Sequence, residues 1–247
     1  MSRPRIAVLA SGGGSNLQAL LCHFDALGDA RAADVVLVAS NRSDAGALDR
    51  ARAASIPTAI IASPRTPDGE ELGPLLERNS IDMVVLAGYL RLIPPDITRR
   101  FAGRMLNVHP GPLPEFGGPG MYGARVHRAV LASGARMSGP TVHFVDEIYD
   151  HGATIAHWPV PVLDGDDEHS LAARVLRAEH VLFPRVVQAM IAGEVANGTV
   201  LTLPAFDPSL DACATDHVAD QVFSPGGLRP PHREGTDAIA DHAETRG

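Results

Sequence analysis

Short runs of apolar residues alternate with longer amphipathic stretches through the first half of the chain. The apolar runs predict buried strands, and the stretches between them, with apolar residues at helical spacing, predict helices. Strands are expected at residues 6–10, 34–40, 59–62, 83–87 and 106–108, and helices at 16–27, 45–54, 70–79 and 96–101. Continuously apolar strands joined through helices are typical of a parallel sheet that is covered on both faces. The pattern therefore predicts an α/β fold with a doubly wound, mostly parallel, Rossmann-like sheet.

The second half of the chain follows a different pattern. Residues 113–123 are rich in glycine and proline, and a helix is expected at 124–132. Two further segments, 141–145 and 154–162, are rich in residues that favour strands, and they are expected to form an antiparallel pair. This half therefore predicts a β-rich part that extends the sheet.

A long helix and an acidic tail complete the expected organisation. Ser170 is a suitable N-cap for a helix that runs to about residue 192, with a kink at Pro184. Residues 206–247 contain eight acidic and three basic residues and almost no aromatic ones, so they lack the apolar surface that a core requires. We expect a folded body over residues 1–205 and a disordered tail over 206–247.

The composition excludes several classes of protein. The chain has 247 residues, of which 45% are hydrophobic and 20% charged, as in ordinary globular proteins. No apolar stretch is long enough for a membrane span or a signal peptide, so a cytoplasmic location is expected. Cys22 and Cys213 are 191 residues apart, which indicates neither a disulfide framework nor a zinc cluster. The net charge of −8 disfavours a nucleic acid partner.

A glycine-rich loop follows the first expected strand and opens the first expected helix. Free backbone N–H groups and the positive end of the helix favour an anion at such a place. The dinucleotide-binding fingerprint is absent, because Leu17 replaces its third glycine and the second strand ends in Ser40-Asn41-Arg42 without an acidic residue. A monophosphate site is one interpretation, and a tight turn without ligand is the other. The residues concerned are Gly12, Gly13, Gly14, Ser15 and Asn16.

Two polar residues come at the end of the fifth expected strand. Asn107 and His109 lie on one face of that strand, because side chains alternate with a period of two. Ligands of open α/β sheets bind at the carboxyl ends of the strands, so an amide and an imidazole here suit a transition-state site. The residues alone leave a second interpretation open, in which the pair only holds a loop in place.

Five segments of this sequence resemble the phosphoribosylglycinamide formyltransferases. They are IAVLASGGGSN (6–16), VVLAGYLRLI (84–93), LNVHPGPLP (106–114), TVHFVDEIYDHG (141–152) and ARVLRAEHVLFP (173–184). The resemblance extends over about residues 4–195, in order and at consistent spacing, and does not include the tail. This family transfers a formyl group from 10-formyltetrahydrofolate to the amine of 5-phosphoribosylglycinamide in purine biosynthesis.

The resemblance implies roles for individual residues. Asn107, His109 and Asp150 match the catalytic residues of the family, so residues 1–205 are expected to form the catalytic domain. The glycine loop matches the site for the acceptor's phosphate, and Glu179 matches a glutamate that holds the acceptor. The folate pocket is implied at Tyr89, Leu90, Arg91, Leu92, Asn107, Val145, Asp146 and Asp150.

The sequence departs from the family pattern beside the expected folate site. Gly111-Pro112 stands where many members have Ser-Leu, and the loop 115–123 is longer than the commonest form. His127, just after this loop, is expected to be a residue of the helix start and not a catalyst. Asp146 is expected to be a loop acid beside the catalytic Asp150.

Formyl transfer requires donors aimed at the oxyanion of a tetrahedral intermediate. The Asn107 amide and a protonated His109 can supply them, and Asp150 would favour the imidazolium. The expected cosubstrate is 10-formyltetrahydrofolate, and no metal is expected, because the histidines show no HExxH spacing. Small molecules are the expected partners of a monomer or homodimer.

Three other functions remain to be distinguished. Formyltetrahydrofolate hydrolase is the main alternative, although its members carry a regulatory domain before the catalytic one. Methionyl-tRNA formyltransferase would require a basic surface and an RNA-binding domain. The chain could also be a non-catalytic phosphate-binding module. An assay of formyl transfer with and without the glycinamide acceptor distinguishes these possibilities.

Overall fold

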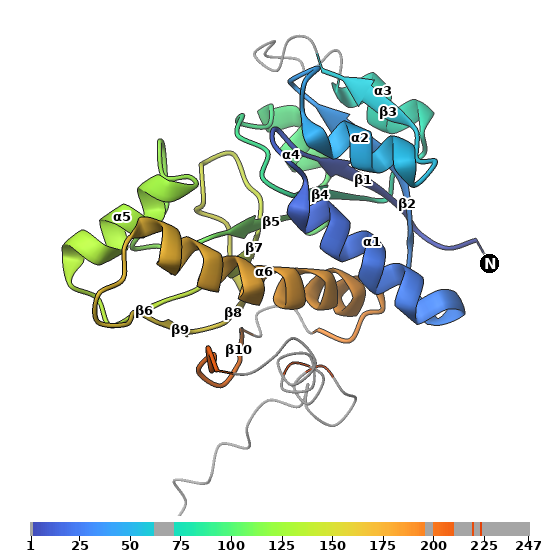
Figure 1. Cartoon of the computed structure of the whole chain (residues 1–247). Coiled ribbons are helices and arrows are strands. Elements are labelled where there is room, and N and C mark those ends of the chain that lie inside the picture. Colours follow the sequence, from blue (N-terminus) through green and yellow to red (C-terminus); the bar gives the residue numbers. More distant parts are fainter. Residues whose placement is uncertain (1, 62–71, 196–199, 210–218, 220–222, 224–247) are drawn as a thin grey trace, which may run out of the picture.

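The computed structural model describes residues 2–61, 72–195, 200–209, 219 and 223. An eight-stranded sheet has the strand order β10-β8-β7-β5-β4-β1-β2-β3 (Figure 1). Five of its strands form a continuous parallel block, which confirms the expected doubly wound layer. These are β1 (Arg5–Leu9), β2 (Asp34–Ser40), β3 (Thr58–Ile60), β4 (Met83–Leu86) and β5 (Met105–His109).

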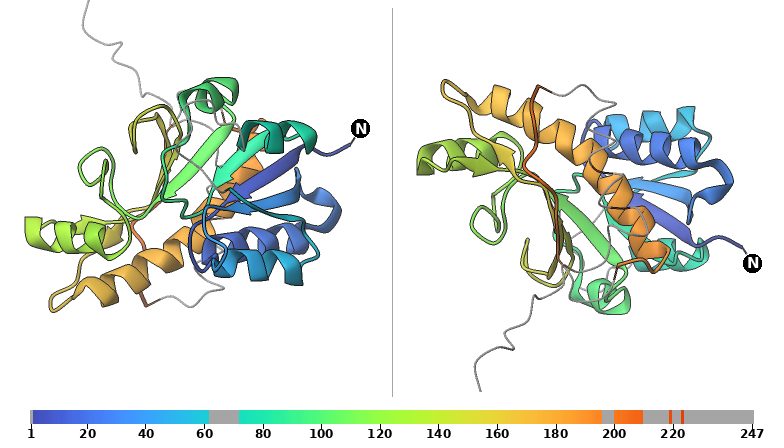
Figure 2. Two further views of the ribbon diagram at one scale, coloured as in Figure 1. Left: turned by 90° about the horizontal axis from the view of Figure 1, so that it is seen from above. Right: turned by 90° about the horizontal axis from the view of Figure 1, so that it is seen from below.

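Helices cover both faces of this sheet (Figures 1 and 2). They are α1 (Ser15–Leu27), η1 (Gly28–Ala30), α2 (Gly46–Ala53), α3 (Leu72–Arg78), α4 (Pro95–Arg100), α5 (Ala124–Ser133) and α6 (Glu168–Ile191). Ile6 and Val8 of β1 pack with α1, α2, α5 and α6 in one core cluster. Ala7 and Leu9 pack with α3 and α4 in the other. Because both faces are covered, successive residues of β1 are apolar.

The antiparallel pair expected in the second half is present. β7 (Thr141–Phe144) pairs antiparallel with both β5 and β8 (Thr154–His157), and β10 (Leu201–Thr202) adds a parallel edge. The segment expected as one strand over 154–162 is interrupted after His157. Its last part, β9 (Val160–Pro161), pairs instead with β6 (Met137–Ser138) in a separate two-stranded sheet.

The helix α6 begins two residues before the expected cap. Asp167 is the N-cap, and its carboxylate accepts hydrogen bonds from the backbone N–H groups of His169 (3.0 Å) and Ser170 (2.8 Å). Ser170 is the third helical residue, and its hydroxyl accepts from the Asp167 N–H (3.0 Å), which completes a capping box. The expectation of Ser170 as the cap is therefore wrong. The helix continues through Pro184 to Ile191.

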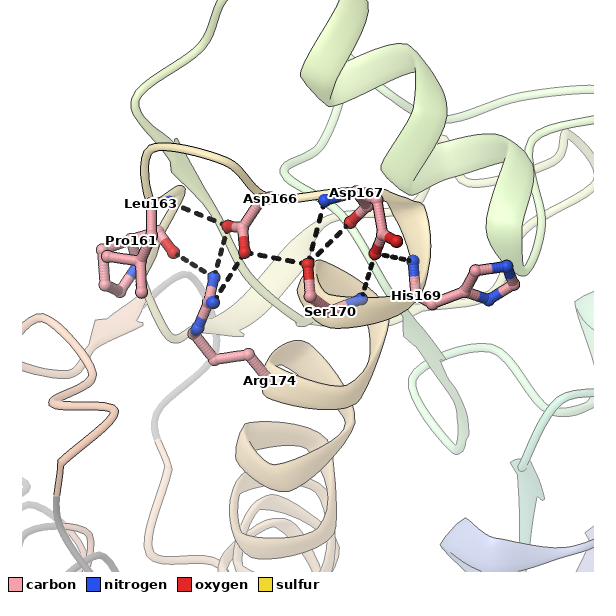
Figure 3. A network of polar contacts seen from close by, with 7 residues as sticks. All are labelled: Pro161, Leu163, Asp166, Asp167, His169, Ser170 and Arg174. Carbon is pink, nitrogen blue, oxygen red and sulfur yellow. Dashed lines mark hydrogen bonds and ion pairs between the residues drawn. The ribbon is translucent and has the colours of Figure 1, made fainter.

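An ion pair holds the start of α6 against β9 (Figure 3). The Arg174 guanidinium makes two contacts with the Asp166 carboxylate, at 2.6 and 2.8 Å, and donates to the Pro161 carbonyl at 3.0 Å. Asp166 also accepts from the Leu163 N–H and the Ser170 hydroxyl. The hydrogen bond from Arg174 lowers the pKa of Asp166 far below its usual range. This network fixes the helix whose next turns line the functional site.

Packing continues across the boundary expected at residue 205. Phe206 is 3% exposed and contacts the Trp158 ring edge-on, with centroids 5.5 Å apart. The Trp158 indole N–H donates to the Pro204 carbonyl (2.8 Å), and the Arg177 guanidinium lies over the Phe206 ring. Most of 206–247 lies outside the described residues, so the division at 205 stays a prediction. Within the described residues, no helix has the length and hydropathy to cross a membrane.

Candidate active site

A cavity of about 630 Å³ lies at the carboxyl ends of β1, β4 and β5, where the fold places ligands. The starts of α1 and α5 and one side of α6 form its walls. A second cavity, of about 50 Å³, shares Tyr89, Asn107, Tyr149 and Asp150 with it. Of the residues expected from the sequence, Asn16, Tyr89, Leu90, Asn107, His109, Asp150 and Glu179 line the larger cavity, and Arg91, Leu92, Val145 and Asp146 line the smaller one.

His109 is buried at the end of β5, and both of its ring nitrogens face defined groups. Nε2 lies 2.8 Å from the Phe116 carbonyl, which can only accept, so Nε2 carries a proton. Nδ1 lies 3.5 Å from Asp150 Oδ2. Burial lowers the pKa of His109, and the Asp150 carboxylate opposes this effect without cancelling it. At neutral pH the imidazole is therefore uncharged, whereas the expected mechanism uses its protonated form.

Asp150 is held in place from several directions. It has a left-handed backbone (φ 53°), and its carboxylate accepts the Gly118 N–H at 3.0 Å. Burial raises its pKa, but the neighbouring His143 and His109 rings and the Gly118 N–H together lower it below the usual range. Asp150 is therefore a carboxylate at neutral pH.

His143 is a site residue that the sequence reasoning missed. It lies opposite Asn107 in the antiparallel pairing of β5 and β7. Its Nδ1 donates to the Phe144 carbonyl (2.7 Å), so in the neutral ring Nε2 can accept the Asn107 amide N–H (3.0 Å). Nε2 also lies 3.6 Å from Asp150. The histidine within the segment 141–145, facing a polar strand end, was the available signal.

Asp146, unlike Asp150, is bonded to its own loop beside the smaller cavity. Asp146 accepts hydrogen bonds from the Ile148 N–H (2.9 Å) and the His151 ring (2.7 Å), as expected of a loop acid. Its loop forms one wall of the smaller cavity, opposite Tyr89. Burial raises the pKa of Tyr89 to about 12, so its hydroxyl stays protonated. Leu90, Leu92, Ile148 and Tyr149 add exposed apolar surface there.

The three glycines of the loop have different surroundings. Gly14 has φ 75°, and a Cβ atom there would lie 2.6 Å from the Cα atom of Ala47 in α2. Cβ atoms at Gly12 and Gly13 would meet nothing within 4 Å. The Arg50 guanidinium donates to the Gly13 carbonyl at 2.8 Å and so holds the loop against α2. The four residues Gly12, Gly13, Gly14 and Ser15 do not line the larger cavity, whereas Asn16 does.

Asn16 and Glu179 connect the glycine loop to α6. The Asn16 amide N–H donates to the Glu179 carboxyl at 2.7 Å. Burial raises the pKa of Glu179 to about 7, against the lowering effect of this hydrogen bond. Asn16 Oδ1 is buried without a hydrogen-bond partner in the described part of the chain. Asn16 and Glu179 both line the larger cavity, so its wall is polar at this end.

The site combines an amide, a neutral imidazole and a carboxylate in one cavity, whose wall also includes Asn16 at the end of the glycine loop. Residues 4–187 match the family model described as formyl transferase, and the chain belongs to that family. The phosphoribosylglycinamide formyltransferase of Arabidopsis thaliana is 43% identical over 193 residues, which cover 76% of this chain and 65% of that protein. The chain thus spans slightly less than two thirds of this curated relative.

Solved structures of the same name are similar along nearly their whole length. The phosphoribosylglycinamide formyltransferase of Brucella melitensis is 40% identical, with a TM-score of 0.69 over 79% of this chain and 99% of that one. The enzyme of Anaplasma phagocytophilum is 30% identical, with a TM-score of 0.72 over 82% of this chain and 99% of that one. These relatives agree with the family resemblance of the sequence motifs.

Proposed function

We propose that the chain transfers the formyl group of 10-formyltetrahydrofolate to the amine of 5-phosphoribosylglycinamide, in de novo purine biosynthesis. One observation carries this proposal. Asn107 and Asp150 line both cavities; the larger one also contains His109, Asn16 and Glu179, and the smaller one Arg91 and Leu92. A folate fits the apolar end, and a polar ribonucleotide fits the end beside the glycine loop. The names of the relatives support the acceptor and the transfer of a formyl group.

The acceptor's phosphate is assigned to the glycine loop. The open sides of Gly12 and Gly13 allow close approach of phosphate oxygens to the first N–H groups of α1. Ser15 and Asn16 follow in the first helical turn, and Glu179 holds the sugar side of the acceptor. The donor's ring system is assigned to Tyr89, Leu90, Arg91, Leu92, Asn107, Val145, Asp146 and Asp150.

The reaction forms a bond from the acceptor amine to the formyl carbon and breaks the bond from that carbon to folate N10. One Asn107 amide hydrogen is directed to His143, which leaves the other for the oxyanion. His109 Nδ1 takes the proton that the attacking amine releases and passes it to N10. Asp150 stabilises the imidazolium during this transfer. The protonated His109 expected from the sequence thus arises in the reaction.

Further expectations about cofactors, location and partners belong to the same proposal. We expect the formyl donor to be a cosubstrate and no metal to take part in the reaction. We also expect a cytoplasmic monomer or homodimer that acts on small molecules and not on nucleic acid. The Arabidopsis relative is named as chloroplastic, so location needs a direct measurement by fractionation.

A formyl transfer assay tests this function. Purified protein is mixed with 10-formyltetrahydrofolate, with or without 5-phosphoribosylglycinamide, and formylglycinamide ribonucleotide, formate and tetrahydrofolate are measured by mass spectrometry. Formylated product that depends on the acceptor is the expected result. Formate release without acceptor would indicate the hydrolase, and the absence of both products would leave only a binding module.

A further inference from the structure

His127 is a buried histidine that the mechanism above does not use. It lies in the first turn of α5, is 4% exposed and lines the larger cavity. Its position at the helix start agrees with the sequence, but its burial was not expected. Its Nδ1 is fully buried without a hydrogen-bond partner, and no described residue contacts Nε2 by a hydrogen bond or ion pair. The buried Nδ1 cannot reach a ligand, but Nε2 belongs to a side chain of the cavity wall and has no protein partner to compete with a bound molecule.

The surroundings of His127 determine which nitrogen can meet a ligand. Because Nδ1 is sealed inside the protein, Nε2 is the nitrogen that can face the cavity. Burial, with the nearby His109, lowers the pKa of His127 to about 4, so the ring is neutral at physiological pH. A proton on Nδ1 would be buried without an acceptor, which favours the tautomer with its proton on Nε2. His127 therefore offers one N–H donor to the cavity.

The approach of α5 to the catalytic strand depends on Gly111. A Cβ atom at Gly111 would lie 2.6 Å from Val126 Cγ1, beside His127, and 3.5 Å from His109 Nε2. The glycine thus lets the first turn of α5 lie close to His109. Gly111 also lies at one of the two places where this sequence departs from the commonest family pattern.

We propose that His127 Nε2 donates a hydrogen bond to the amide carbonyl of the glycinamide acceptor and so contributes to its binding. This inference rests on the proposed formyl transfer. The acceptor amine must reach the formyl carbon beside His109, and its carbonyl is one carbon further along the molecule. A neutral donor suits an amide oxygen, which carries no full charge. Each of the three helices around the cavity then supplies one polar residue to the acceptor: Asn16 from α1, His127 from α5 and Glu179 from α6.

Two substitutions separate binding from folding. The Gln amide nitrogen in His127→Gln can reach the position of Nε2, so this variant is expected to keep most acceptor affinity. His127→Leu removes the donor but fills a similar volume, and is expected to raise the acceptor KM about tenfold. Its kcat and its KM for the folate are expected to change less than threefold. Its melting temperature is expected to equal or exceed that of the wild type, because an unpartnered buried nitrogen is removed.

His180→Gln is the matched control. His180 also has a buried nitrogen without a partner in the described structure, but it does not line the cavity. Its substitution is expected to leave both KM values unchanged. If the wild type transfers formyl groups and His127→Leu has an unchanged acceptor KM, or a raised folate KM instead, the inference is wrong. If the wild type transfers no formyl group, the proposed function itself is wrong.

Discussion

The catalytic centre and the acceptor end of the same cavity differ in how their polar groups are satisfied. At the centre, Phe116, Gly118 and His143 already hold His109, Asp150 and Asn107. At the acceptor end, Asn16 Oδ1 and the cavity-lining His127 ring have no hydrogen-bond partner among the described residues, and a Cβ atom at Gly12 or Gly13 would face open space. Groups that act in the transition state are therefore oriented by hydrogen bonds within the protein. Groups that bind substrate instead keep hydrogen-bonding capacity that the substrate can use.

The largest effect is expected from the catalytic centre. Asn107→Ala, His109→Ala and Asp150→Ala should each lower kcat by about 100-fold or more, because these groups act mainly in the transition state. The losses in a double variant should not add, since the three groups work as one unit. Steady-state kinetics and melting curves on each purified variant measure this. A kcat of His109→Ala close to that of the wild type would contradict the proposed mechanism.

A second prediction uses the raised pKa of Glu179 at the acceptor end. Its pKa is about 7 in the folded protein and near 4.5 in an unfolded chain. Between these values the folded protein binds more protons, so this residue makes the free energy of unfolding fall as pH rises from 4.5 to 7. Glu179→Gln removes the buried charge and should stabilise the protein at pH 8 by at most ~3 kcal/mol, with little change at pH 4.5.

Urea unfolding at both pH values gives this difference directly. Glu77→Gln, the same substitution at an exposed position, is the matched control. If the free energy of unfolding depends on pH equally in the wild type and in Glu179→Gln, ionisation of Glu179 costs no stability. The contrast between the catalytic centre and the acceptor end would then be weaker.

The smallest effect is expected at the glycine loop. Substitutions at the neighbouring Gly13 and Gly14 should affect different properties, substrate binding at the first and stability at the second. Gly13→Ala places a Cβ atom in open space, so it should keep the melting temperature and raise the acceptor KM about tenfold by obstructing the phosphate. Gly14→Ala should instead destabilise the fold by about 1–3 kcal/mol, because of its positive φ and its contact with Ala47.

The two readouts distinguish a phosphate site from a tight turn. Affinity is compared for the acceptor with and without its 5′-phosphate, in the wild type and in Gly13→Ala. Loss of the phosphate should weaken binding to the wild type more than to the variant. An equal loss in both proteins would place the phosphate elsewhere and leave the loop as a turn.

Local sequence determined the features that depend on neighbouring residues. The apolar runs specified the parallel strands, and a period of two placed Asn107 and His109 on one face at the end of β5. The family resemblance added Asp150 and Glu179, which local pattern could not connect to the site. The sequence also predicted a glycine loop before α1, but it could not distinguish the structural roles of the three glycines.

Tertiary structure decided whatever depends on contacts between distant residues. Gly14 differs from Gly13 because Ala47 packs against it, and Asn16 meets Glu179 across 163 positions of the chain. His143 became a site residue because β7 pairs with β5, and Phe206 became a core residue because Trp158 lies beside it. His127 is buried without a partner only once α5 docks beside Gly111. Burial and hydrogen-bond satisfaction are properties of the assembled fold, so no local pattern of residues could specify them.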